Sequence, residues 1–292
     1  MTEVMKYFPA NNKIHKNYNT KLMKTVIKAI AMAGLAALVA CTSSPEAKKK
    51  IYMIGDSTMA NKPTEKGNQE RGWGQMMPLC FDSMVVVSNH AINGRSTKSF
   101  IDQGRWDAVR DSLMPGDYLI IQFGHNDEKA DTARHTEPWG DYIANLRRFA
   151  REAKEKGATP IICNSIVRRN FAKVADAVAQ DDKAGQSEQL DAEGDSLIET
   201  HGEYLAAAQK AAEEEGVLFI DMNKMTRELV QGYGPIKSRE LYVWAEPGTV
   251  EAYPDGKKDN THLNIEGATK VSHMAAEEIG QLVPELGAHL VK

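Results

Sequence analysis

Short runs of apolar, β-branched residues recur along the chain from residue 51 onward, and each run is bounded by Gly, Pro, Asn or Asp. Runs of this length and composition predict buried β-strands. The five predicted strands are Ile51 to Ile54, Met84 to Val87, Tyr118 to Phe123, Thr159 to Ser165 and Val217 to Ile220.

Stretches with helical patterning lie between and after these runs. The six predicted helices are Trp73 to Phe81, Trp106 to Leu113, Trp139 to Lys156, Ser196 to Glu215, Met222 to Gln231 and Asn264 to Leu282. Gly157 and Gly216 are suitable helix ends, and Asn264 is a suitable N-cap. Alternating strands and helices predict an α/β domain with a five-stranded parallel sheet covered on both faces.

The predicted domain extends from residue 51 to residue 292, because no internal repeat and no Pro/Ser-rich linker divides it. Its least patterned segment is Ala172 to Asp195, which is acidic and rich in alanine. We interpret this segment as a surface excursion.

The N-terminal 40 residues have the layout of a secretory signal peptide. Their apolar stretch, Ala29 to Ala40, has 12 residues, whereas a membrane-spanning helix needs about 20. Lys24 and Lys28 precede it, and small residues follow. Met23 would open a signal of ordinary length, so residues 1 to 22 are interpreted as the product of a misplaced start codon. The alternative is a short buried helix of the folded domain.

The sequence Leu38-Val39-Ala40-Cys41 resembles the lipobox of bacterial lipoproteins. This resemblance implies cleavage before Cys41, lipidation of that cysteine, and export to a membrane-anchored position in the periplasm or at the cell surface. Residues 41 to 50 are polar and charged, and they are expected to form a lipidated tether.

The composition is that of a globular protein, with 42% hydrophobic and 26% charged residues. The net charge of −4 conceals an asymmetry, because residues 1 to 40 hold six Lys and one acid. The remaining residues comprise 30 basic and 39 acidic side chains and therefore carry −9. This balance disfavours nucleic acid as a partner. The three cysteines are too few for a disulfide framework, and Cys80 and Cys163 show no zinc-site spacing.

Polar residues follow the predicted strands at their carboxyl ends, where ligands bind in such sheets. Ser57 follows the first strand and can act as a nucleophile if a base and an orienting acid accompany it. Asp259 and His262 lie three residues apart, so one local turn can join the carboxylate to the imidazole. Gly94 offers a backbone N–H, and Asn126 offers a side-chain amide, for a developing oxyanion.

Other readings of these polar residues remain. His90 and His125, together with Asp127, could be imagined as metal ligands, but their spacing has no metal signature, and polar residues satisfied at strand ends explain them as well. Asp56 and Asp127 are expected to bind the backbone of their own turns.

Four blocks of the chain are similar to those of the SGNH (GDSL-like) hydrolases. They are Gly55-Asp56-Ser57, Gly94, Gly124-His125-Asn126-Asp127 and Asp259-Asn260-Thr261-His262. The extended segments resemble the rhamnogalacturonan acetylesterases in particular, over roughly residues 51 to 283. These segments are Gly55 to Ala60, Arg71 to Gln75, Asn93 to Ser96, Phe123 to Asp127, Arg168 to Phe171 and Tyr253 to Gly256.

The resemblance implies a flavodoxin-like three-layer α/β/α sandwich. It further implies that Ser57 is the nucleophile, His262 the base and Asp259 the orienting acid, and that Ser57, Gly94 and Asn126 form the oxyanion hole. No metal and no cofactor is needed for this chemistry.

A polyuronide substrate would be repelled by a body of charge −9, so local cations are expected at the site. Arg95, Arg168 and Arg169 lie near the predicted edge and are candidates for binding carboxylates; the alternative is that they pair with neighbouring acids. Trp139, at a helix start, and Trp244, in a predicted loop, could stack on sugar rings, or could pack within the protein.

The sequence therefore predicts a serine esterase that removes O-acetyl groups from pectic rhamnogalacturonan. One alternative is an acetylesterase acting on another glycan, such as acetylated xylan. A second is a non-catalytic surface lipoprotein that binds glycans.

Overall fold

The computed structural model describes residues 47–171 and 196–291. The predicted signal peptide, the lipidation site at Cys41 and the segment Ala172 to Asp195 lie outside the described residues. Strand β1 begins at Lys49, so the last two residues assigned to the tether belong to the sheet. Within the described residues, we find no helix with the length and apolar character needed to cross a membrane.

The core of the fold is a five-stranded parallel sheet with the strand order β2-β1-β3-β4-β5. All five strands predicted from the sequence are present, so the predicted fold class is confirmed. Their bounds are β1 Lys49–Gly55, β2 Val85–Asn89, β3 Tyr118–Gln122, β4 Thr159–Cys163 and β5 Leu218–Ile220. Each neighbouring pair is parallel, with Ile51 opposite Tyr118 between β1 and β3.

The central strands are buried on both faces, which explains their continuous apolar sequence. Successive residues of β1 alternate between two separate cores: Ile51 and Met53 pack on one face, and Tyr52 and Ile54 on the other. Strand β2 lies at the edge of the sheet and is only partly buried, although it begins with three valines.

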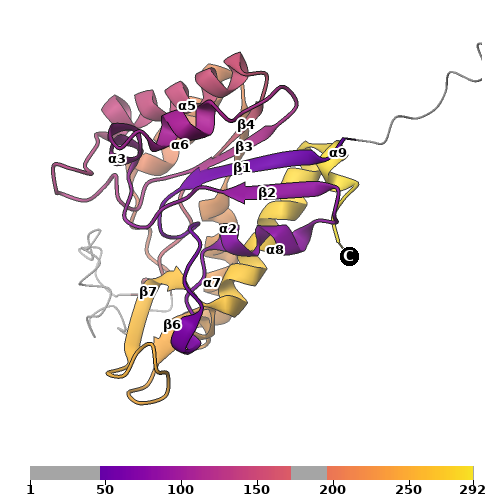
Figure 1. Ribbon diagram of the computed structural model, residues 1–292. Coiled ribbons are helices and arrows are strands. Elements are labelled where there is room, and N and C mark those ends of the chain that lie inside the picture. Colours follow the sequence, from indigo (N-terminus) through magenta and orange to yellow (C-terminus); the bar gives the residue numbers. More distant parts are fainter. Residues whose placement is uncertain (1–46, 172–195, 292) are drawn as a thin grey trace, which may run out of the picture. The chain divides into compact units, whose positions relative to one another are not determined.

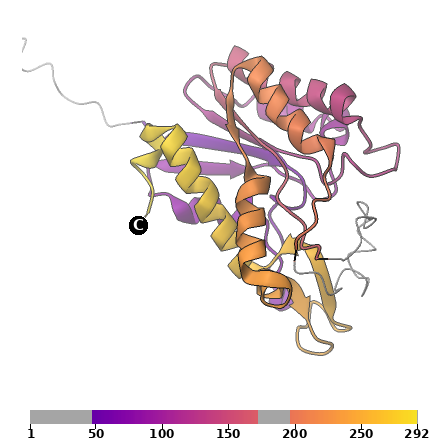
Figure 2. The ribbon, with the colours of Figure 1, turned by 180° about the vertical axis from the view of Figure 1, so that it is seen from behind.

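Helices cover both faces of the sheet (Figures 1 and 2), as predicted. Helices α2, α7 and α8 pack on the face that holds Ile51, and α3 to α6 pack on the face that holds Tyr52. The helices are α2 Trp73–Met76, α3 Thr97–Asp102, α4 Arg105–Arg110, α5 Ile143–Glu155, α6 Glu203–Glu215, α7 Met222–Lys237, α8 Ile265–Leu282 and α9 Pro284–Gly287.

Several helix boundaries differ from the prediction. The first predicted helix ends at Met76 and continues as a 3-10 turn that contains Pro78. Helix α3 was not predicted, although Ser96 caps it by accepting the backbone N–H of Ser99. Residues 196–202 are not helical, so the helix predicted from Ser196 begins at Glu203. Asn264 caps α8 as predicted, since its side chain accepts the backbone N–H of Gly267 at 3.0 Å.

A two-stranded antiparallel sheet, formed by β6 (Tyr242–Ala245) and β7 (Lys257–Leu263), is a feature that the sequence prediction missed. Figure 1 shows this hairpin beyond one end of the main sheet, close to α7. Strand β7 reads Lys-Lys-Asp-Asn-Thr-His-Leu, and such charged and amide residues are poor strand formers, which explains the omission. Trp244 therefore lies on a strand and not in the predicted loop.

Candidate active site

Ser57 lies in the tight turn that follows β1. The backbone carbonyl of Asp56 accepts the N–H of Ala60 at 3.0 Å, and the side chain of Asp56 accepts the N–H of Thr58 at 2.9 Å. The strand can turn this closely because Gly55 has no side chain: a Cβ there would lie 2.6 Å from the carbonyl oxygen of Gln122 on β3. The two hydrogen bonds of Asp56 and the close approach of Gly55 to β3 together fix the position of Ser57.

The structure brings Ser57 together with His262 and Asp259, as the sequence analysis predicted. The hydroxyl oxygen of Ser57 lies 2.8 Å from Nε2 of His262, and Nδ1 of His262 lies 2.9 Å from Oδ2 of Asp259. The other carboxylate oxygen of Asp259 accepts the backbone N–H groups of Thr261 and His262, each at 2.8 Å. This arrangement can transfer the serine proton to the imidazole and orient the ring.

Asp259 is kept ionised by its surroundings. Burial opposes its ionisation, but the neighbouring His262 and Lys257 outweigh that effect and hold the pKa of Asp259 well below its usual range. The amino group of Lys257 lies 3.3 Å from Oδ2 of Asp259, the oxygen that contacts His262. The carboxylate is therefore available to stabilise an imidazolium.

A network of charged side chains connects β7 to the loop that contains Gly94. Lys257 contacts Glu70 at 2.9 Å, and Glu70 contacts the buried Lys62 at 2.7 Å. Lys62 in turn donates to the side-chain oxygen of Asn93 at 2.6 Å. Burial opposes the ionisation of Glu70, but His262 and the two lysines outweigh it and lower the pKa of Glu70 to about 2.

Gly94 and Asn126 both lie next to Arg95, since Gly94 precedes it in the chain and Asn126 donates a hydrogen bond to its carbonyl. The backbone of Gly94 has φ 71°, which favours glycine, while a Cβ there would meet no atom within 4 Å. The side-chain amide of Asn126 donates to the carbonyl of Arg95 at 3.1 Å, and its oxygen accepts from Arg134 at 3.2 Å. Arg134 therefore fixes which way the amide of Asn126 faces, with its NH₂ group toward the Gly94 loop.

His90 and Asp127 are hydrogen-bonded within the protein, whereas the buried ring nitrogens of His125 have no hydrogen-bond partner among the described residues, and its Nδ1 lies 3.6 Å from Oδ2 of Asp56. His90 lies 2.8 Å from the hydroxyl of Ser88 and stacks on Tyr52, while His125 packs edge-on against His201. Within residues 47–171 and 196–291, no group of three or more His, Cys, Asp or Glu side chains is arranged to hold a metal ion.

Asp56 and Asp127 differ in their partners. Asp56 accepts from Thr58 in its own turn, as expected. Asp127 accepts instead from the backbone and hydroxyl of Thr97, at 3.0 and 2.5 Å, and from the hydroxyl of Thr136. Asp127 thus joins its own loop to the start of α3. The expectation that it binds the backbone of its own turn was wrong.

Arg168 and Arg169 were candidates for binding substrate, with pairing to neighbouring acids as the alternative, and the structure favours the alternative for Arg168 and places Arg169 in contacts within the protein. Arg168 is 9% exposed and forms a salt bridge with the buried Glu128. Arg169 is 1% exposed, and its guanidinium donates to Ser238 at 3.0 Å and to Asn260 at 2.8 Å. Both arginines are therefore occupied inside the protein.

The other three candidate binding residues lie nearer the surface. Trp139 is 51% exposed. Trp244 is partly buried, and the guanidinium of Arg239 lies 4.5 Å from its ring centroid, so one ring face is already covered by protein. Arg95 is partly exposed and lines a cavity together with Gly94.

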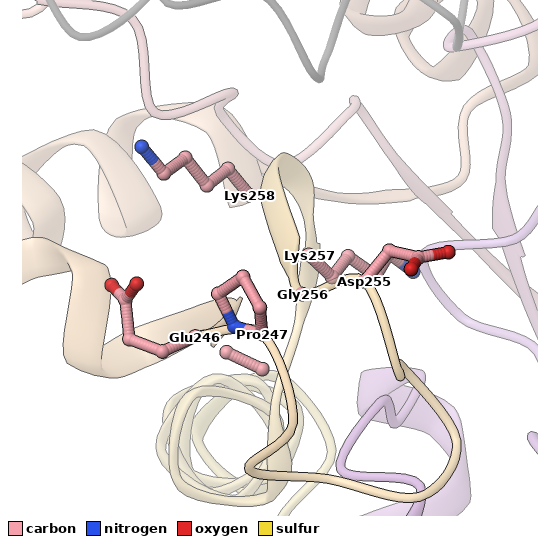
Figure 3. A pocket seen from close by; sticks show the side chains of 7 residues that line it. Glu246, Pro247, Asp255, Gly256, Lys257 and Lys258 are labelled. Carbon is pink, nitrogen blue, oxygen red and sulfur yellow. The ribbon is translucent and has the colours of Figure 1, made fainter.

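Two cavities lie near this edge of the molecule. One, of about 450 Å³, extends from Gly94 and Arg95 to Arg134. The other, of about 340 Å³, lies at the loop end of the β6–β7 hairpin, where the two strands join their connecting segment (Figure 3). In Figure 3, Lys258 and Glu246 extend to the opposite side of the hairpin from Asp255.

The sequence analysis missed Lys62, Glu70, Lys257 and Arg134. Lys257 could have been found only if β7 had been predicted as a strand, because residues i and i+2 of a strand share a face and Lys257 precedes Asp259 by two. The other three come from loops that only the fold brings to the site.

Cys80 and Cys163 are buried free thiols.

A five-stranded parallel sheet with a hydrogen-bonded Ser–His–Asp set at its carboxyl edge is the arrangement of α/β hydrolases that use a serine nucleophile. Comparisons with known proteins agree with this class and identify the family within it. The family model described as GDSL-like lipase/acylhydrolase matches residues 53 to 270. The chain belongs to this family and is an SGNH esterase.

Two named relatives come from different organisms. The chain is 38% identical to the rhamnogalacturonan acetylesterase RhgT of Bacillus subtilis over 242 residues, which cover 83% of this chain and 94% of the relative. It is 29% identical to a rhamnogalacturonan acetylesterase of Emericella nidulans, over 84% of this chain and 89% of the relative.

The solved structure of the protein YxiM from Bacillus subtilis has a similar fold, with a TM-score of 0.62 at 24% identity. The match covers 82% of this chain and 58% of that one.

Proposed function

We propose that this esterase removes acetyl groups from pectic rhamnogalacturonan. The observation that carries the proposal is the 38% identity to RhgT, which is named a rhamnogalacturonan acetylesterase and is matched over nearly its full length. A second relative with the same named activity, from Emericella nidulans, supports the same substrate class.

In the proposed mechanism, Ser57 is the nucleophile, His262 the base and Asp259 the orienting acid. The Ser57 oxygen forms a bond to the acetyl carbonyl carbon as its proton passes to Nε2 of His262. The 2.8 Å contact between these two atoms supports this step. The resulting oxyanion is stabilised by the N–H groups of Ser57 and Gly94 and by the amide of Asn126.

The tetrahedral intermediate then collapses. The bond between the carbonyl carbon and the sugar oxygen breaks, and the sugar hydroxyl leaves with the proton from His262. Water attacks the acetyl-enzyme, gives its proton to His262, and releases acetate while Ser57 regains a proton. Asp259 remains ionised throughout and stabilises the imidazolium, in agreement with its depressed pKa.

The test is acetate release from a panel of acetylated rhamnogalacturonan, acetylated xylan and acetylated monosaccharides. The proposal requires the highest kcat/KM on rhamnogalacturonan. A preference for xylan would replace the substrate and leave the esterase chemistry intact. Absence of hydrolysis across the panel and on a chromogenic acetate would contradict the mechanism as well.

We also propose that the enzyme is exported and anchored to a membrane through Cys41. The support is the lipobox-like sequence before Cys41 and the short apolar stretch preceding it. Such an anchor would hold the enzyme where extracellular glycans are available.

A further inference from the structure

The proposed substrate is a polyanion, whereas residues 41 to 292 carry a net charge of −9. Arg168 and Arg169 cannot neutralise a uronic acid, because both are buried in contacts with the protein. If the enzyme binds a polyuronide, other cations must supply the local positive potential. The described surface near Gly94 contains such a group.

The cavity of about 450 Å³ that starts at Gly94 is lined by three cations, Arg95, Lys98 and Arg134, and by two carboxylates, Asp102 and Asp131. Its walls connect directly to the proposed oxyanion hole. The carbonyl of Arg95 accepts from Asn126 at 3.1 Å, and Arg134 donates to the same amide side chain at 3.2 Å. A group bound in this cavity would therefore lie on the oxyanion-hole side of the proposed active site.

The cations of the cavity differ in their partners. Arg134 pairs with Asp131 at 2.6 Å, and Lys98 donates to the carbonyl of Thr132 at 2.7 Å. Arg95 is held only by neutral oxygens, with Nε donating to the side chain of Gln103 and Nη1 to the carbonyl of Asn93, each at 2.9 Å. Within the described part of the chain, no carboxylate forms an ion pair with Arg95.

Arg95 is thus pre-organised, since two hydrogen bonds fix its guanidinium, and its charge is not compensated by an ion pair. A fixed guanidinium favours a carboxylate because it can donate two parallel hydrogen bonds. The adjacent Asp102 and Asp131 can accept hydrogen bonds from sugar hydroxyls. This combination suits a uronic acid better than a neutral sugar or a lipid chain.

We propose that this cavity is the subsite for a uronic acid residue of the substrate and that Arg95 binds its carboxylate. The inference rests on the proposed function and deepens it, because it assigns the preference for an acidic glycan to particular residues. Arg134 has a further role as a positioning residue, since it fixes the amide of Asn126.

The test compares Arg95→Gln with Arg105→Gln. Arg105 is a matched control, because it donates to the same oxygen of Gln103, at 2.8 Å, but does not line the cavity. The substrates are acetylated rhamnogalacturonan oligosaccharides and the same oligosaccharides with methyl-esterified carboxyl groups. Arg95→Gln should raise the ratio of KM for the acid to KM for the methyl ester about tenfold, as expected for loss of a charge-assisted hydrogen bond.

Arg105→Gln should leave this ratio unchanged. An equal rise in KM for both oligosaccharides in Arg95→Gln, or the same change in both variants, would overturn the proposal. Thermal unfolding of both variants checks that neither fold is altered.

A second measurement separates this proposal from the proposed function. Trigalacturonate without acetyl groups should inhibit hydrolysis of 4-nitrophenyl acetate competitively, and its inhibition constant should rise about tenfold in Arg95→Gln. This result would support the subsite even if rhamnogalacturonan proved not to be deacetylated. Inhibition that is equal in wild type and Arg95→Gln would refute the subsite even if rhamnogalacturonan is the substrate.

Discussion

Replacing Glu70 by Gln tests the charge network behind the candidate active site. Glu70 lies between Lys62 and Lys257, at 2.7 and 2.9 Å, and its side chain is 15% exposed. Burial alone would raise its pKa, but His262 and the two lysines lower the pKa from 4.5 to about 2. The part of that difference due to His262 requires a charged imidazolium, so at neutral pH the pairs with the two lysines contribute on the order of 1 to 2 kcal/mol of folding free energy.

The sign of the pH dependence follows from the direction of the shift. Because the pKa of Glu70 is lower in the folded protein, its carboxylate stabilises the fold fully above pH 4.5, and this contribution is lost as the pH falls toward 2. Glu70→Gln should therefore lower the free energy of unfolding by on the order of 1 to 2 kcal/mol near pH 7. The difference from wild type should shrink to less than about 0.5 kcal/mol near pH 2, where the carboxylate of Glu70 is half protonated even in the folded protein.

The assay is reversible urea unfolding of wild type and variant at both pH values. Glu251→Gln serves as the control, because Glu251 pairs with Lys66 at 3.7 Å and both side chains are largely exposed. This control should change stability by less than about 0.5 kcal/mol. A Glu70→Gln variant as stable as wild type near pH 7, or a difference that does not vary with pH, would refute the reasoning.

Other substitutions test the proposed chemistry and export. Ser57→Ala should lower kcat on a chromogenic acetate by roughly a millionfold, with an unchanged melting temperature; activity near wild type would exclude a serine nucleophile. Asp259→Asn should lower kcat about 10⁴-fold, measured on the same ester, because the imidazole loses its orienting carboxylate. Asn126→Ala should cost about 10²- to 10³-fold in kcat with a smaller change in KM, and an unchanged kcat would remove this amide from the oxyanion hole. Cys41→Ala should move the protein from the membrane fraction to the soluble fraction on cell fractionation, and an unchanged distribution would argue against lipidation.

The sheet and the Asp259–His262 pair were predictable because each leaves a local signal, whereas the assignment of Ser57 as their partner, 205 residues away, came from its place at a strand end and from the family resemblance. Strands such as β3 are buried on both faces, and every residue from Tyr118 to Gln122 is buried. A strand of this kind has a nearly continuous apolar sequence, which distinguishes it from the polar segments around it. Asp259 and His262 interact across three residues, and their geometry depends on a turn within a single segment. Short-range patterns of this kind can be read from the sequence.

The surroundings of the site could not be predicted, because they depend on contacts between distant segments. Lys62 and Glu70 are both charged, and their sequence suggests exposed loops. Their burial follows from the packing of those loops against β7, where Lys257 lies. The ends of helices were likewise misjudged where turns such as the one at Pro78 interrupt an apolar pattern.

Arg169 illustrates how a residue with a plausible role in binding proves to have a structural one. Its backbone N–H donates to the carbonyl of Asn260 at 2.8 Å, and its guanidinium donates to the side chain of the same residue at 2.8 Å. Asn260 directly follows Asp259 on β7, and this strand belongs to a two-stranded hairpin outside the main sheet. A two-stranded hairpin is only marginally stable by itself. Arg169 therefore attaches the strand that carries Asp259 and His262 to the segment that follows β4, and this attachment, together with the Lys257–Glu70 pair, holds the imidazole at its 2.8 Å distance from Ser57.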